Sequence, residues 1–167
     1  TILLTHMHPD HSNGLSTADG SKLFPNAEIV VSETDVEFWH DDGARSRAPE
    51  SQQTRYFDGA REQIAPYQGQ RKAPGDSVFP HVNAINLSGH TPGHTGYLIE
   101  SSGEALLIWG DICHVPDIQV RRPEVHMAFD VDPQQAIATR QRAFEMAVAD
   151  KLLVAGMHLH FPGFSYM

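Results

Sequence analysis

Short apolar runs separated by polar stretches predict strands that alternate with helices. Strands are predicted where β-branched and other apolar residues cluster, at residues 2–5, 28–32, 82–87, 95–100, 105–109 and 152–155. A helix is predicted over residues 133–149, with Asp132 at its N-cap and Pro133 at its first position, and a shorter one over 34–41. This order of elements predicts an α/β or layered α+β domain.

Residues 41–76 are the most polar region of the chain. A helix within 51–64 is one interpretation of this region, although its apolar residues fit a single helix face poorly. Two hypotheses stay open for it: a solvated, variable surface insertion, or a lid that covers a substrate.

Composition excludes several classes of protein. The 167 residues suit one domain, so we expect a single domain over 1–167. With 12 Lys and Arg against 21 Asp and Glu, the net charge is −9, which argues against a nucleic-acid-coating role. No stretch approaches the roughly 18 apolar residues of a membrane span. The single cysteine, Cys113, excludes an internal disulfide framework and a multi-thiolate zinc finger, and is expected to be a packing residue.

Eleven histidines direct attention to metal chemistry, because imidazole is a common metal ligand. The strongest motif is THMHPDH, residues 5–11, directly after the first predicted strand. In an extended chain His6 and His8 point the same way, and Pro9 disfavours a helical His8. Asp10 and His11 then follow in a turn. Four metal-ligand types within six residues at a strand end fit a two-metal site.

Three weaker motifs also follow apolar strands. They are GHTPGH with His90 and His94, Gly110-Asp111, and a late Gly156-Met157-His158. A histidine or aspartate at one strand end is more often a cap or turn residue. Four ligand-bearing loops that each follow an apolar strand are harder to obtain by chance. All four could therefore open on one edge of a sheet.

This set of motifs resembles the metallo-β-lactamase-fold hydrolases, over a match that runs from Thr5 to about Gly163. The resemblance implies an αββα sandwich built from two similar halves, with the first strands of the N-terminal half lying before Thr1. It also implies that one metal ion is held by His6, His8 and His90. Asp10, His11 and His158 would hold the other ion, and Asp111 would bridge the two. His94 would orient a ligand by hydrogen bonding.

Residues 23–27 (LFPNA), Phe38-Trp39 and the ending HLHFPG look like the branch that contains methyl parathion hydrolase and related lactonases. In that branch an aromatic residue matching Trp39 shapes the substrate pocket. Phe57 and His114 are further candidates for the pocket.

The implied function is hydrolysis of an ester, lactone or phosphotriester. Two divalent ions, zinc first, with manganese, cobalt or iron as alternatives, would lower the pKa of a bridging water and supply hydroxide. Asp111 would set the spacing of the ions, and Asp10 could also carry a proton to the leaving group. We expect a small-molecule substrate, no membrane partner and no nucleic-acid partner, and a homodimer stays open.

Other functions are kept as alternatives: an iron-dependent redox member of the superfamily (a sulfur dioxygenase or flavodiiron type), a nuclease of the RNase Z type, or a non-catalytic module. The chain opens inside a predicted strand and has no visible signal peptide, so we expect a piece of a longer protein. Its compartment is unknown and taken as cytoplasmic by default.

Overall fold

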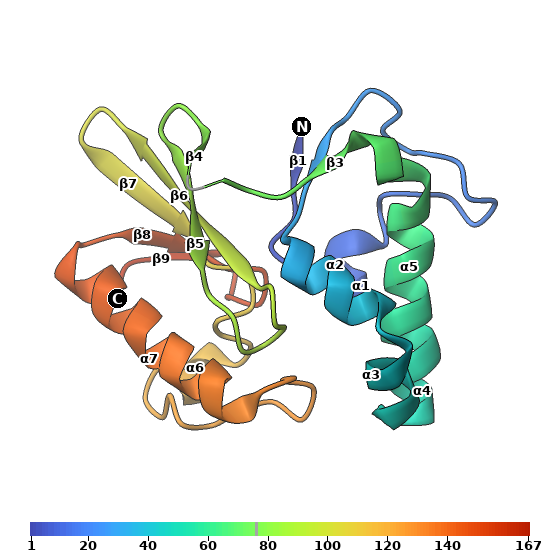
Figure 1. Ribbon diagram of the computed structural model, residues 1–167. Coiled ribbons are helices and arrows are strands. Elements are labelled where there is room, and N and C mark those ends of the chain that lie inside the picture. Colours follow the sequence, from blue (N-terminus) through green and yellow to red (C-terminus); the bar gives the residue numbers. More distant parts are fainter. Residues whose placement is uncertain (76) are drawn as a thin grey trace. The chain divides into compact units, whose positions relative to one another are not determined.

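The computed structural model describes residues 1–75 and 77–167, and the chain forms two compact units, Thr1–Ala73 and Pro74–Met167 (Figure 1). Both units combine a sheet with helices, which confirms the predicted mixed α/β class. Asp76, the last residue of the polar region 41–76, lies outside the described residues.

Unit 1 contains a three-stranded parallel sheet in the order β1-β2-β3, formed by Ile2–Leu3, Ile29–Val30 and Arg71–Lys72. The helices of this unit are α1 (Pro9–Ser12), α2 (Glu33–His40), α3 (Asp42–Arg47), α4 (Glu50–Gln52) and α5 (Gly59–Ile64). A π-helical segment, η1 (Gln53–Asp58), joins α4 to α5, and a 3-10 segment, η2 (Ala65–Gln70), leads into β3.

The polar region after residue 41 contributes to the core of unit 1. Phe57, Ala60, Ile64 and Tyr67 are buried in one cluster with apolar residues of the first strands and of α2. The Tyr67 hydroxyl donates a hydrogen bond to the Leu15 carbonyl, 2.8 Å away. These segments therefore stabilise the unit from inside, in addition to presenting a polar surface.

Unit 2 contains a six-stranded sheet in the order β4-β5-β6-β7-β8-β9. All neighbouring pairs are antiparallel except β7 and β8, which are parallel. The strands are Ser77–Phe79, Val82–Asn86, Thr95–Ser101, Glu104–Ile108, Leu153–Ala155 and Phe164–Ser165.

Helix α7 (Pro133–Ala149) packs its buried residues against the six-stranded sheet and so completes the unit 2 core (Figure 1). Asp132 caps this helix, because its side chain accepts a hydrogen bond from the Gln135 backbone N–H at 3.0 Å. Ala143, Phe144 and Ala147 pack in one cluster with buried residues of β7 and β8. A short helix, α6 (Pro116–Gln119), precedes α7. In the described ranges, no helix is both long and apolar enough to cross a membrane.

Gly89 lies where the loop after β5 meets the start of α7. Its φ is +133°, and a Cβ built there would lie 2.4 Å from the backbone nitrogen of Ala136. Backbone atoms of a helix cannot move aside cheaply, so only glycine fits. The loop that carries His90 is thereby held close to α7.

We predict that Gly89→Ala destabilises the protein more than Gly103→Ala. Both glycines have positive φ, but nothing lies within 4 Å of a Cβ at Gly103. Gly103→Ala therefore reports backbone strain alone, about 1–2 kcal/mol, whereas Gly89→Ala adds an overpacking cost of about 1–3 kcal/mol. The free energy of unfolding in urea measures both. Equal losses would contradict the close packing of this loop on α7.

Candidate metal centre

The first group of predicted ligands follows β1 and leads into α1. His8 is extended (φ −65°, ψ 155°) and is the N-cap of α1, because the residue before a proline avoids helical geometry. His6 and His8 therefore stay on one extended segment, and His6 Nε2 lies 3.2 Å from His8 Nδ1. Both side chains are buried. Two imidazole nitrogens this close suit a shared proton or a shared cation.

Asp10 and His11 lie on the single turn of α1. Their ligand atoms, Asp10 Oδ2 and His11 Nε2, are 3.5 Å apart, and the Asp10 side chain is exposed. The rings of His6 and His11 are 4.1 Å apart between centroids. This segment of unit 1 thus gathers three histidines and one carboxylate, as its spacing predicts.

A buried carboxylate from α2 supports this segment. Asp35 is fully buried, and its Oδ2 accepts hydrogen bonds from the Met7 backbone N–H at 2.9 Å and from the Trp39 indole N–H at 3.1 Å. Met7 lies between His6 and His8, so Asp35 holds the backbone from which both imidazoles extend.

In unit 2, three imidazoles converge on one oxygen of Asp111. Asp111 Oδ2 lies 3.1 Å from His114 Nε2, 3.2 Å from His158 Nε2 and 3.4 Å from His90 Nε2. Asp111 follows β7 and His158 follows β8, and these neighbouring strands are parallel. Parallel strands end at the same edge of a sheet, which brings the two residues together.

His90 is held at both ring nitrogens. Its Nδ1 lies 2.7 Å from Asp130 Oδ1, and its Nε2 faces Asp111. Burial disfavours the charged imidazolium, but the hydrogen bonds with Asp111 and Asp130 outweigh this effect and raise the pKa of His90. Burial likewise opposes ionisation of Asp130, but the hydrogen bonds from His90 and from the Met127 backbone N–H outweigh it and lower the pKa of this carboxyl.

His94 holds the backbone of Asp111. It is buried, and its Nδ1 lies 3.0 Å from the Leu87 carbonyl, which can only accept a hydrogen bond. Its Nε2 accepts one from the Asp111 backbone N–H at 3.0 Å. His94 therefore positions Asp111 through the main chain.

His114 lies against the other unit 2 histidines. Its ring stacks on His158 at 4.8 Å with an interplanar angle of 24°, and it contacts Phe129 edge-on at 5.1 Å. Burial lowers the pKa of His114, against the opposing effect of Asp111. In the described part of the chain, the buried Nδ1 of His114 has no hydrogen-bond partner.

The two aromatic residues predicted for the substrate pocket lie in the core of unit 1. Trp39 is 1% exposed and Phe57 is 3% exposed, and their rings pack edge-on at 4.8 Å. The Trp39 ring is nonetheless adjacent to His8, with centroids 5.3 Å apart. The Tyr56 ring, which the sequence did not single out, lies closer to His8 at 4.9 Å.

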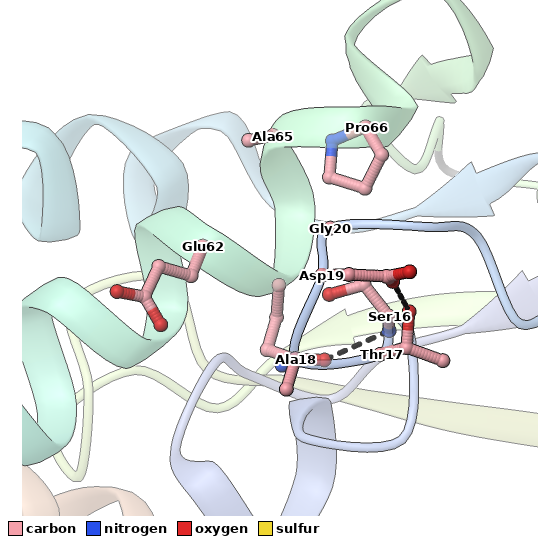
Figure 2. Close-up of a pocket in the computed structure, with 9 residues that line it drawn as sticks. Ser16, Thr17, Ala18, Asp19, Gly20, Glu62, Ala65 and Pro66 are labelled. Carbon is pink, nitrogen blue, oxygen red and sulfur yellow. Dashed lines mark hydrogen bonds between the residues drawn. The ribbon is translucent and has the colours of Figure 1, made fainter.

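A separate pocket of about 620 Å³ opens in unit 1 between the loop at residues 16–20 and the segment at 62–66. Figure 2 shows this loop with Asp19, which accepts a hydrogen bond from the Thr17 hydroxyl. None of the predicted ligands is among the described residues that line it. Its polar lining comes from this loop and from Glu62 and Gln63 of α5, and it contains no histidine or cysteine among the described residues, so we assign no metal site to it.

The donor set fits divalent metal ions. Within each unit, neighbouring ligand atoms of the histidines and aspartates lie within 4.8 Å of one another. Imidazole nitrogens and carboxylate oxygens are ligands of zinc, manganese, cobalt and iron. The described residues therefore include histidine and aspartate groups that could hold metal.

Sequence reasoning missed Asp35 and Asp130. Asp35 lies within a predicted helix, four residues before Trp39, and reads as a solvated acidic residue. Asp130 lies two residues before the N-cap Asp132, in a segment with no periodicity. Only tertiary packing distinguishes these two carboxylates from the exposed ones around them.

Comparison with known proteins gives consistent results. A family model of the metallo-β-lactamase superfamily matches residues 1–158. An uncharacterized protein of Bacillus subtilis, YobT, is 34% identical over 110 residues, which cover 66% of this chain and 44% of YobT.

Two solved structures superpose on nearly all of this chain. One is described as the hydrolase AbOPH of the β-lactamase superfamily, with 37% identity and a TM-score of 0.87. The other is AidC, a dizinc quorum-quenching lactonase in complex with a product, with 26% identity and a TM-score of 0.91. Each match covers 99% of this chain, which spans 58% of the AbOPH chain and 59% of the AidC chain. The match over residues 1–158, on a chain whose histidines and aspartates follow the strand ends, shows that this protein belongs to the metallo-β-lactamase superfamily.

Proposed function

We propose that this chain carries the dinuclear metal centre of a hydrolase that cleaves an ester, a lactone or a phosphotriester. The observation that carries the proposal is the convergence of imidazole nitrogens on Asp111 Oδ2, at 3.1–3.4 Å, on a buried carboxylate. A buried carboxylate ringed by imidazoles is an arrangement that a bound cation stabilises further, because buried charges are typically paired or bind metal. Membership of the superfamily supplies the reaction class.

We propose that the ligands of the two units act together. The assignment follows the order of the motifs along the chain and the family resemblance. One ion is assigned to His6, His8 and His90, the other to Asp10, His11 and His158, with Asp111 shared between them. Zinc is the first choice of ion, because imidazoles and carboxylates are ligands of catalytic zinc and the similar protein AidC is described as a dizinc lactonase.

Two divalent ions, when bound, supply Lewis acidity and make a water nucleophilic at neutral pH. The protein contributes groups that hold or move protons. The Asp10 side chain is exposed to solvent, and we assign to its carboxylate the transfer of a proton to the leaving group. Burial disfavours the charged form of His114, and its neutral ring can donate one hydrogen bond, from Nε2 to the Asp111 carboxylate.

The similar proteins support the proposed substrate class. AidC is described as a lactonase, and AbOPH as a hydrolase. Lactones and phosphotriesters both develop negative charge on one oxygen as water attacks, so one centre could serve either. The acidic chain, with net charge −9, favours an uncharged small molecule over a polyanion.

We predict that the zinc-loaded chain hydrolyses at least one substrate of a panel: an aryl ester, an acyl-homoserine lactone and a phosphotriester. Metal analysis of the purified chain is expected to give two ions per chain. Two bound ions without turnover of any panel member would refute the substrate class. A single bound iron without hydrolysis would instead favour the redox alternative.

Asp111→Asn is predicted to remove metal and activity together. Neutralising the shared carboxylate should lower the metal content below two ions and kcat/KM by about 100-fold or more. Asp150→Asn is the matched control, because Asp150 is an exposed residue at the C-terminal end of α7. Full activity in Asp111→Asn would exclude the dinuclear assignment.

Cys113→Ala is predicted to retain kcat/KM within about 3-fold. The thiol is buried, and burial raises its pKa to about 11, so only roughly one molecule in ten thousand carries a thiolate at pH 7. Hydrolysis assays on the variant test this expectation. Loss of activity in a variant that still folds and binds metal would point to a cysteine nucleophile instead.

A further inference from the structure

We infer that Asp130 is a positioning residue that fixes the orientation and tautomer of His90 for metal binding. The inference rests on the proposed function, since it assigns His90 as a ligand. Asp130 Oδ1 lies 2.7 Å from His90 Nδ1, and the two side chains are 0% and 3% exposed. None of the motifs in the sequence contains this carboxylate.

The backbone around Asp130 is locked to the loop that carries His90. The Val131 N–H donates to the His90 carbonyl at 3.0 Å, and the Asp132 N–H donates to the Gly89 carbonyl at 3.0 Å. Two main-chain hydrogen bonds made by the residues directly after Asp130 therefore hold its backbone next to that of His90. Asp130 cannot withdraw from His90 without breaking them.

The second oxygen of Asp130 is also occupied. Asp130 Oδ2 accepts a hydrogen bond from the Met127 backbone N–H at 2.8 Å. The buried guanidinium of Arg140, on α7, has its Nη2 3.9 Å from the same oxygen. Arg140 is itself fixed by bonds to the carbonyls of Ile112 and Pro123, both 2.7 Å long. A nearby fixed cation and a backbone donor together favour the ionised carboxylate in this buried position.

An ionised carboxylate can only accept hydrogen bonds, so His90 Nδ1 must carry the proton. In the neutral ring the lone pair then lies on Nε2, which is the nitrogen that faces Asp111 at 3.4 Å. His90 is thus held as a ready ligand through Nε2. His6 differs, because its Nδ1 lies 3.0 Å from the Thr5 hydroxyl, a neutral group that can donate or accept. The carboxylate specifies one tautomer, whereas the hydroxyl does not.

The test compares Asp130→Asn and Asp130→Ala with Asp132→Asn in the full chain. In Asp130→Asn, the amide oxygen can accept the His90 Nδ1–H only if the amide NH2 faces the Met127 backbone N–H, where two donors would meet. With the amide turned the other way, its NH2 donates to Nδ1 and forces the His90 proton onto Nε2. Asp132 is the matched control: it is two residues away, caps α7 through the Gln135 N–H, and Asn caps a helix equally well.

Three measurements decide the inference. Competition with a chromophoric chelator is expected to show zinc affinity lowered 10- to 100-fold in both Asp130 variants, and within about 3-fold of wild type in Asp132→Asn. Nitrogen-15 NMR of the metal-free wild type, recorded at a pH high enough for the His90 ring to be neutral, is expected to show His90 protonated at Nδ1, with the signal assigned by its loss in His90→Gln. Urea unfolding of the metal-free proteins separates a loss of affinity from a loss of folding.

Unchanged zinc affinity in the Asp130 variants would overturn the inference, and so would a wild-type His90 protonated at Nε2 alone. The NMR result stands even if the Asp130 variants fail to fold. Failure of the proposed function looks different: a wild-type chain that binds zinc, loses affinity on substitution of Asp130, and yet hydrolyses nothing would retain the positioning role.

Discussion

Burial of the Asp111 carboxylate is the constraint on which the arrangement of unit 2 depends. A charge taken out of water costs several kcal/mol unless other groups compensate it. Here the compensation comes from the nitrogens of three histidines around Oδ2. Each of these histidines must then be placed by its own loop. The loops after β5, β7 and β8 must consequently hold their histidine nitrogens at about hydrogen-bond distance from Asp111 Oδ2.

Both units place their predicted metal ligands after strand ends and take the supporting carboxylate from a helix or from the segment just before one. In unit 1, Asp35 on α2 holds the backbone at Met7. In unit 2, Asp130, shortly before α7, holds the ring of His90. The strand ends determine where each predicted ligand enters its loop. The two carboxylates, on or just before a helix, then hold the backbone at Met7 and the ring of His90 in place. The helices therefore stabilise the core and also orient the predicted ligands.

The sequence predicted the ligand segments well because their positions depend on local geometry. Helix α7 covers the predicted 133–149, and the strands β5, β6, β7 and β8 fall within a residue or so of prediction. Strands β3, β4 and β9 lie outside the apolar runs of the sequence, so no pattern predicts them, and each is defined by its pairing with a neighbouring strand. Asp35 and Asp130 could not be predicted for a related reason: a buried carboxylate looks like an exposed one until the chain is folded.

Burial also affects which aromatic residues could set substrate specificity. Trp39 was a candidate for the substrate pocket, but its indole N–H donates to Asp35 and its ring packs on Phe57 in the core. Asp35 in turn holds the backbone between His6 and His8. A substitution at Trp39 would therefore affect a substrate only indirectly, through the backbone between His6 and His8 and through the stability of unit 1. Tyr56 is less buried, and its ring lies nearer to that of His8 at a tilted angle, so Tyr56 can change with less disturbance of the core. In this chain, substitution of Tyr56 is thus expected to cost less stability than substitution of the buried indole of Trp39.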